Sequence, residues 1–283
     1  RSKAPWQCLV EFLGVFVLLL LTQGSVAQAV TSEENKGNFF TTCLASSLAV
    51  TVAISDLSGA HLNPAFSLAM CLVGRLPWAK LPVYCVVQLL SAFCASGATY
   101  ILYYVPLSLE DALQNYTGGN LTVTGPKEAA SIFATYPSPY LSLNNGFLDV
   151  LGTWMLIVGL LATLDRRNKG APAGLEPVVV GLLILTIGLS MGANCGFPLN
   201  PARDLGPRIF YFAGWGPGVF SAGNGWWWVP PVAPMVGATL GTAEYQLLVA
   251  LHHPEDLEPF PKVMASQLKA SDLVTLAQLE CKL

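Results

Sequence analysis

Charged residues are scarce in this sequence of 283 residues. Asp, Glu, Lys and Arg make up 11% of the chain, whereas hydrophobic residues make up 53%. A soluble domain carries roughly a quarter charged residues. The shortage of charge therefore excludes an ordinary soluble protein and favours a chain that lies in a lipid bilayer.

Patterns that serve nucleic-acid binding, catalysis or metal binding are also missing. The formal net charge is −3, there are three histidines, and no basic stripe, His-Glu-x-x-His motif or phosphate-binding glycine loop occurs. The seven cysteines are an odd number and lack the spacing of metal ligands. We therefore predict no nucleic-acid partner, no enzyme activity, no cofactor and no metal, and we expect the cysteines to be buried free thiols.

Long apolar runs are what the chain has in abundance. A transmembrane helix needs roughly 20 apolar residues. The first run resembles a signal peptide in position, but it is too long and lacks a persuasive cleavage site, so we predict a retained helix. Six such runs, three in each half, are predicted to span the membrane: about 6–30, 39–56, 80–104, 147–164, 175–192 and 226–251.

Two shorter apolar stretches, 61–73 and 195–213, lie between these runs, and each contains the triplet Asn-Pro-Ala. Asn is a favoured helix N-cap and Pro is favoured at the first helical position, so each triplet predicts the start of a short helix. One such triplet alone is more often an ordinary turn or cap. The triplet residues are Asn63, Pro64, Ala65, Asn200, Pro201 and Ala202.

The second half of the chain is predicted to run through the membrane upside down, because each half has three spans, an odd number. The two short helices then start near the midplane from opposite faces. Each Asn uses its side-chain oxygen as the cap, which leaves its NH₂ group to donate to a permeant, while the positive helix ends oppose cations and protons. This arrangement predicts a pore for uncharged, oxygen-bearing molecules.

The positions of Lys and Arg predict the orientation. They precede the first run, lie between the second and third, and follow the fourth, which are therefore cytoplasmic. The sequons at Asn115 and Asn120 agree, because glycosylation is extracellular. We predict a first repeat at 1–104, an extracellular loop at 105–146, a second repeat at 147–251 and a cytosolic tail at 252–283, with both termini in the cytoplasm.

The residues around both triplets, Ser58–Ala65 and Leu199–Arg208, resemble the major intrinsic protein family, and the resemblance covers about 6–251. It implies an all-α membrane protein with six transmembrane helices and two re-entrant half-helices in an inverted 3+3 repeat. It also implies a homotetramer in the plasma membrane with one pore in each subunit.

The same resemblance implies the residues that select the permeant. Arg203 resembles the arginine of the family's outer constriction, with Ser46, Gly188 and Phe197 around it, and the small Ser46 and Gly188 leave room for glycerol. Asp204 resembles the glycerol-conducting branch and is expected to brace a loop through a salt bridge. Three further positions resemble markers of that branch: Tyr136, Arg208 and Pro230.

Three polar residues lie near or within the apolar segments. Glu11 is costly there unless it is paired, and the resemblance implies that it braces the loop behind the first triplet in preference to touching permeant; Asp149 is its counterpart. His61 has two interpretations: a pH-sensitive element near the cytoplasmic mouth, since imidazole titrates near ~6.5, or a structural group that orients the loop.

Several places depart from the family pattern. Three segments are shorter than the family pattern: the link 54–58 and the stretches after Asp149 and Phe210. Val105–Glu110 resembles an insertion, and Pro231 stands where the family pattern has an aliphatic residue. We predict passive conduction of water and small uncharged polyols such as glycerol, with ions and protons excluded. Two alternatives stay open: a non-conducting protein of the same fold, and an ion-coupled transporter.

Overall fold

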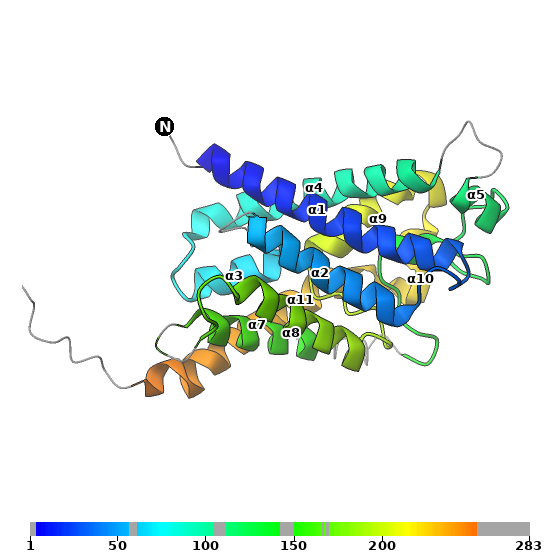
Figure 1. Cartoon of the computed structure of the whole chain (residues 1–283). Helices are drawn as coiled ribbons and strands as arrows, with labels where there is room; N and C mark the ends of the chain where they lie inside the picture. The colour runs from blue at the N-terminus through cyan, green and yellow to red at the C-terminus, as the bar shows by residue number, and fades with distance from the viewer. Residues whose placement is uncertain are drawn as a thin grey trace, which may run out of the picture.

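A computed structural model describes residues 4–56, 61–104, 111–141, 150–165, 167 and 170–253. Helices dominate these residues, and none of them lies in a strand, so the all-helical prediction is confirmed for this part of the chain (Figure 1). The α-helices are α1 (Ala4–Thr31), α2 (Phe39–Asp56), α3 (Pro64–Leu72), α4 (Leu81–Tyr103), α5 (Ala112–Thr117), α7 (Val150–Leu164), α8 (Glu176–Met191), α9 (Pro201–Trp215), α10 (Gly218–Gly225) and α11 (Val229–Leu248).

The helices agree with the predicted apolar runs. Two of the described helices, Pro5–Thr31 and Trp78–Tyr103, are long and apolar enough to cross a membrane by length and composition. Three shorter apolar helices cover Phe39–Ile54, Val150–Leu164 and Glu176–Met191. In α11 the consecutive prolines Pro230 and Pro231 lie in the first turn, where a missing N–H breaks no helical hydrogen bond.

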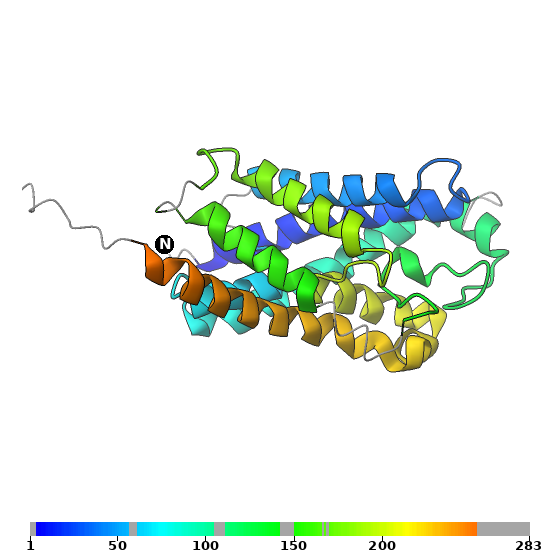
Figure 2. The same cartoon turned by 90° about the horizontal axis from the view of Figure 1, so that it is seen from below.

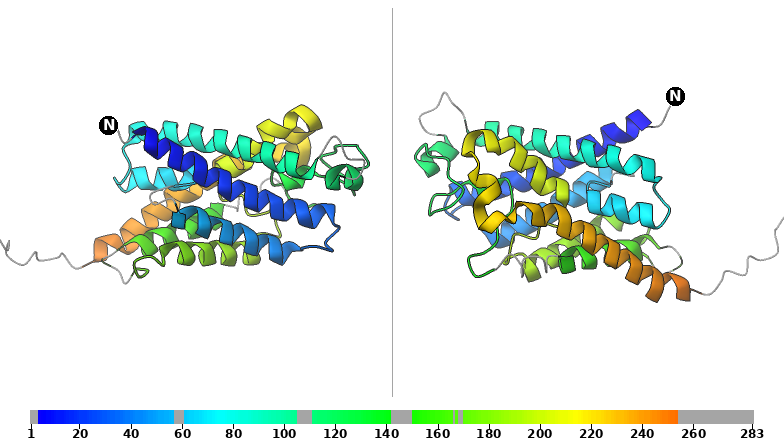
Figure 3. Two further views of the ribbon diagram at one scale, coloured as in Figure 1. Left: turned by 45° about the horizontal axis from the view of Figure 1, so that its top comes forward. Right: turned by 180° about the vertical axis from the view of Figure 1, so that it is seen from behind.

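The bundle has two groups of helices, and each group receives a helix that begins at the Asn-Pro-Ala triplet of the other half of the sequence. α1 packs against α2 and α4, while α7 packs against α8 and α11 (Figures 2 and 3). α9, from the second half, lies against α4, and α3, from the first half, lies against α11. The starts of α3 and α9 are thereby brought to the centre of the molecule.

The structure describes only some of the segments that are shorter than the family pattern. α9 continues as a helix through residues 210–213, so no break occurs there. α2 reaches Asp56, and residues 57–60 lie outside the described residues, as do 105–110, Asp149 and the tail from 254. The six described cysteines are free thiols, but the expectation that all are buried is wrong: Cys43, Cys71 and Cys195 are buried, whereas Cys8, Cys85 and Cys94 are partly exposed. Cys281 belongs to the undescribed tail.

Candidate functional site

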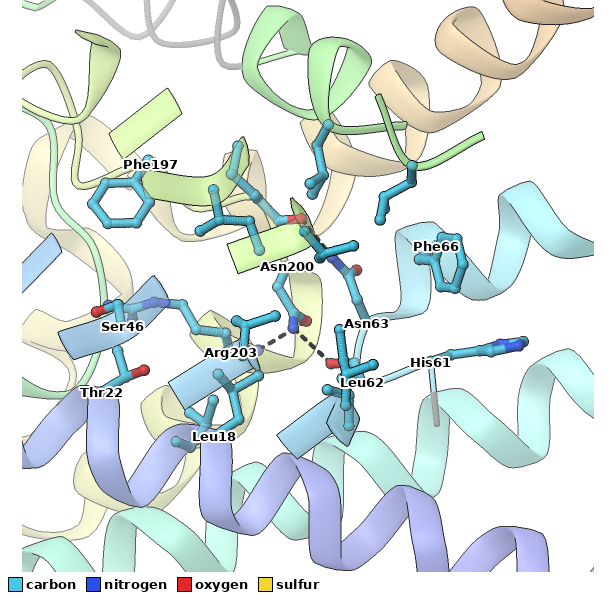
Figure 4. Close-up of a pocket in the computed structure, with 18 of the residues that line it drawn as sticks. Leu18, Thr22, Ser46, His61, Leu62, Asn63, Phe66, Phe197, Asn200 and Arg203 are labelled. Atoms are coloured by element: carbon cyan, nitrogen blue, oxygen red, sulfur yellow. Dashed lines mark hydrogen bonds between the residues drawn. The ribbon is translucent and has the colours of Figure 1, made fainter. Parts of the chain in front are cut away.

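A cavity of about 330 Å³ lies between the two groups of helices (Figure 4). Most of its wall is aliphatic, and its polar groups are few. Figure 4 shows the side chains of Asn63 and Asn200 meeting between Arg203 on one side and His61 on the other. The aliphatic part of the cavity wall includes Leu18, Val50, Ile54, Leu156, Leu160, Val180 and Ile184.

The two asparagines cap their own helices and bind each other's approach segments. Asn63 Oδ1 accepts from the Ala65 amide at 2.8 Å, and Asn200 Oδ1 accepts from the Ala202 amide at 3.0 Å. Asn63 Nδ2 donates to the Leu199 carbonyl at 2.9 Å, and Asn200 Nδ2 donates to the Leu62 carbonyl at 2.7 Å. The two helix starts are therefore locked together by a reciprocal pair of hydrogen bonds.

These bonds correct the expectation that each Asn NH₂ group is left wholly for a permeant. An amide NH₂ has two donor hydrogens. One hydrogen of each asparagine is used on the carbonyl of the opposite approach segment, so only the second remains for the cavity. This use fixes the direction of the remaining donor, because the amide plane can no longer rotate freely.

The approach segments adopt unusual backbone conformations. Leu62 has φ +61° and Phe197 has φ +42°, in the left-handed region that side chains other than glycine rarely occupy. Such conformations cost about 1–3 kcal/mol each and persist only where surrounding contacts enforce them. Here they turn the backbone so that the Leu62 carbonyl faces Asn200.

Glu11 on α1 is 1% exposed and holds the first approach segment. Its carboxylate accepts from the amides of His61 and Leu62, the latter at 3.0 Å, and from Gln88 Nε2 at 2.8 Å. Glu11 does not line the cavity, whereas His61 does. The contacts of Glu11 are therefore those of a brace.

His61 itself is held by its neighbours. Its Nδ1 lies 3.0 Å from Ser67 Oγ, and its ring makes edge contacts with Phe66 and Tyr84 at centroid distances of 5.2 and 5.1 Å. This environment fits the structural interpretation, and the pH-sensitive interpretation stays a prediction.

Three of the four predicted constriction residues line the cavity: Ser46, Phe197 and Arg203. Gly188 lies directly behind Phe197, because a Cβ added at Gly188 would be 3.3 Å from the phenyl ring. The glycine therefore determines how far the ring can withdraw from the cavity. Thr22 on α1 also lines this part of the wall.

Arg203 is oriented by the loop that precedes α7. Its Nη1 donates to the Phe133 carbonyl at 3.2 Å. Gln23, which is fully buried on α1, donates to the same carbonyl at 3.4 Å and to Ser96 Oγ at 2.9 Å. The carbonyl that orients the cation is thus fixed from a second side.

Asp204 and Arg208 form a buried ion pair behind this loop. Both are 0% exposed, and Arg208 Nε donates to Asp204 Oδ1 at 2.5 Å. Asp204 Oδ2 also accepts from the backbone N–H and the hydroxyl of Thr135, at 2.7 and 2.6 Å. Arg208 also donates hydrogen bonds to the backbone carbonyls of Thr135 and Val219. Asp204 lies away from the cavity and has the contacts of a loop brace.

The remaining predicted residues are further from the cavity. The Tyr136 ring lies under Arg208, 4.6 Å from the guanidinium carbon to the centroid, and its hydroxyl lies 2.5 Å from the Tyr211 hydroxyl. Pro230 is buried in the first turn of α11. Asn115 and Asn120 are exposed, whereas Asp149 lies outside the described residues.

Several residues of this site went unnoticed in the sequence. Gln23 and Gln88 are uncharged polar residues inside apolar runs, where an unsatisfied amide is costly, and that cost was the available signal. Glu176, at the start of α8, also lines the cavity.

The sequence Gly188-Leu189-Ser190-Met191-Gly192 matches a hydrolase motif, Gly-x-Ser-x-Gly. Ser190 lies in α8 and donates to the Thr186 carbonyl at 2.7 Å, not on the strand-to-helix turn that the motif requires.

A mostly apolar cavity between membrane-type helices, with two helix starts joined at its centre, defines a channel-type membrane protein. The sequence family described as major intrinsic protein matches residues 1–245. The chain therefore belongs to the major intrinsic protein family, and the resemblance seen in the motifs is confirmed.

The relatives agree with the glycerol-conducting branch. The chain is 77% identical to Aquaporin-10 from Homo sapiens, over 100% of this chain and 95% of that protein. It is 48% identical to Aquaporin-9 from Homo sapiens, over 90% of this chain and 86% of that protein. Among solved structures it is similar to the aquaglyceroporin from Plasmodium falciparum, with a TM-score of 0.75 and 33% identity over 87% of this chain and 96% of that one.

Proposed function

We propose that the protein is a passive channel for water and small uncharged polyols such as glycerol. The observation that carries this proposal is the reciprocal Asn63 and Asn200 pair, which leaves one aimed amide donor from each side in a mostly apolar cavity. Such a site suits a molecule with hydroxyls along one edge and carbon along the other.

Ion exclusion is part of the proposal. Arg203 supplies a fixed cation on the cavity wall, and the N-terminal ends of α3 and α9 add roughly half a positive charge each at the centre. Cations and protons then meet a positive potential in a place with few compensating acceptors. An uncharged polyol meets the same groups as hydrogen-bond donors.

The membrane arrangement follows the sequence prediction. We propose six transmembrane helices and two re-entrant half-helices, α3 and α9, in inverted repeats at 1–104 and 147–251. Residues 105–146 then form an extracellular loop, and 252–283 a cytosolic tail. Both termini face the cytoplasm of the plasma membrane, and the protein is a homotetramer in the lipid bilayer, glycosylated at Asn115 or Asn120.

The test is osmotic shrinkage of proteoliposomes under separate water and glycerol gradients. We expect both permeabilities to exceed those of empty liposomes several-fold, without an ion gradient. Arg203→Val removes the wall cation and is expected to retain glycerol flux while admitting ions. Fluxes equal to those of empty liposomes would support the non-conducting alternative, and a flux that requires an ion gradient would support the transporter.

A further inference from the structure

A second concave site lies on the outer surface of the bundle, away from the cavity, where α7 and α11 run side by side (Figure 2). Its volume is about 440 Å³, within the ~300–1,000 Å³ typical of small-molecule sites. We call it the outer groove. It is lined by Val150, Leu151, Trp154, Leu240, Glu244, Leu247 and Leu248.

The two helices of the outer groove touch through their backbones. A Cβ added at Gly237 would lie 2.4 Å from the Val150 carbonyl oxygen, and one added at Gly241 would lie 2.7 Å from the Trp154 carbonyl oxygen. Small residues allow this close approach between membrane helices. Since both contacts advance by four residues, the helices run parallel and in fixed register, and the groove has a rigid floor.

This register brings a carboxylate onto an indole. Glu244 lies one turn beyond Gly241, and a helical side chain reaches back over the preceding turn. Glu244 Oε2 accepts from Trp154 Nε1 at 2.5 Å. Among the described residues no hydrogen bond to Glu244 Oε1 is found, and this oxygen remains for an incoming donor.

The surroundings of Glu244 decide what can reach that oxygen. By the register above, Glu244 is level with Ile157, about two turns before the end of α7 at Leu164, and it lies about one turn before the end of α11 at Leu248. The walls beside it are leucines that are about half exposed or more: Leu151 49%, Leu240 52%, Leu247 59% and Leu248 64%. A carboxylate on such a face is costly unless it is paired, and the Trp154 N–H meets only one of its two oxygens, so the other is where a cation could bind.

We propose that the outer groove binds a single-chain membrane amphiphile with a protonated amine. The ammonium pairs with Glu244 beside the Trp154 indole, whose π face also attracts cations, and the alkyl chain lies along the leucines. A hydroxyl amphiphile would leave the carboxylate charge unpaired in hydrocarbon. Charge complementarity therefore favours the amine over a neutral lipid.

The test uses the full chain in phospholipid vesicles and the fluorescence of Trp154, obtained as the difference between the wild type and Trp154→Phe. The probe is dodecylamine brominated at its sixth and seventh carbons, because bromine quenches an indole only at close range and the amine end lies beside Trp154, and the matched probe is the corresponding alcohol. We expect saturable quenching by the amine at a membrane concentration at least fivefold below that needed for the alcohol. Glu244→Gln should remove this difference, and Glu34→Gln, in an exposed loop, should leave it unchanged.

Three results would overturn the proposal. The first is equal quenching in the wild type and Glu244→Gln. The second is saturation by the alcohol as readily as by the amine. The third is quenching of Trp154 only after subunits dissociate, since a second copy of the chain would then cover the groove. If Glu244→Gln does not fold, competition decides: unbrominated dodecylamine must relieve quenching in the wild type where dodecanol does not. None of these readouts depends on conduction.

Discussion

The approach segment before Asn63 and the loop before α7 that orients Arg203 are held by different chemistry. Behind the first, the buried Glu11 carboxylate accepts from two backbone amides and Gln88, which are all neutral donors. Behind the loop, Asp204 accepts from Thr135 and is paired with the buried Arg208. The first brace thus relies on hydrogen bonds alone, and the second on an ion pair.

This difference separates positioning from charge. The Asp204–Arg208 pair is neutral as a unit, so it leaves no spare carboxylate for Arg203, which lies beside it on the cavity wall. The neutral donors around Glu11 add no positive charge at the approach segment before Asn63. We infer that electrostatic selection lies with Arg203, whereas the segment around His61 contributes mainly geometry. Four substitutions test these assignments.

The largest effect is expected from Arg208→Met. It leaves Asp204 buried without its cation, and breaking a buried ion pair in this way costs about 3–5 kcal/mol. Thermal unfolding in detergent should show a strongly lowered melting temperature or no folded protein. Arg208→Lys keeps the charge but loses the forked geometry, so its melting temperature should lie between those of Arg208→Met and the wild type. A melting temperature of Arg208→Met equal to that of the wild type would refute the structural role of the pair.

A smaller effect is expected from Glu11→Ala. It removes the acceptor of the His61 and Leu62 amides, and a buried unsatisfied donor costs about 1–3 kcal/mol. Because His61 lines the cavity, water can partly replace the lost acceptor there. Glycerol permeability should fall as the Leu62 carbonyl loses its alignment, with Glu11→Gln retaining part of it. Full permeability in Glu11→Ala would show that the first approach needs no brace.

A selective effect is expected from Gly188→Ala. Its methyl group would contact the Phe197 ring at 3.3 Å and push it toward the cavity. Glycerol permeability should fall several-fold more than water permeability, since glycerol is the wider molecule. Gly24→Ala on α1 is the matched control, because a Cβ there meets nothing within 4 Å. Equal losses for both permeants would place the narrowing elsewhere.

The smallest effect concerns Asp165, just beyond α7. Bonds from the Arg167 side chain and backbone, and from the Tyr245 hydroxyl at 3.1 Å, lower the pKa of this carboxyl. A lowered folded pKa stabilises the protein above the unfolded pKa of ~3.9, and this contribution is lost as the pH falls through the folded value. The difference in melting temperature between the wild type and Asp165→Asn should therefore be larger at pH 7 than at pH 3. A difference independent of pH would contradict this assignment.

The sequence predicted the helices well because their signals are local. Apolar runs of sufficient length anticipated the long helices, and the Asn-Pro pairs predicted that α3 begins at Pro64 and α9 at Pro201. Local signals could not show what each asparagine NH₂ group binds, since Leu199 lies 136 residues from Asn63. The same holds for Gln88 on Glu11 and Thr135 on Asp204, which are 77 and 69 residues apart in the sequence and meet only after the helices pack.

The most direct test of the account measures glycerol flux and electrical current in the same proteoliposomes. We predict that the wild type carries glycerol well above the rate of empty liposomes, with no current and no dependence on an ion gradient. Gly188→Trp, which would drive Phe197 into the cavity, should abolish that glycerol flux. Glycerol entry at the rate of empty liposomes, or entry accompanied by current, would contradict the account.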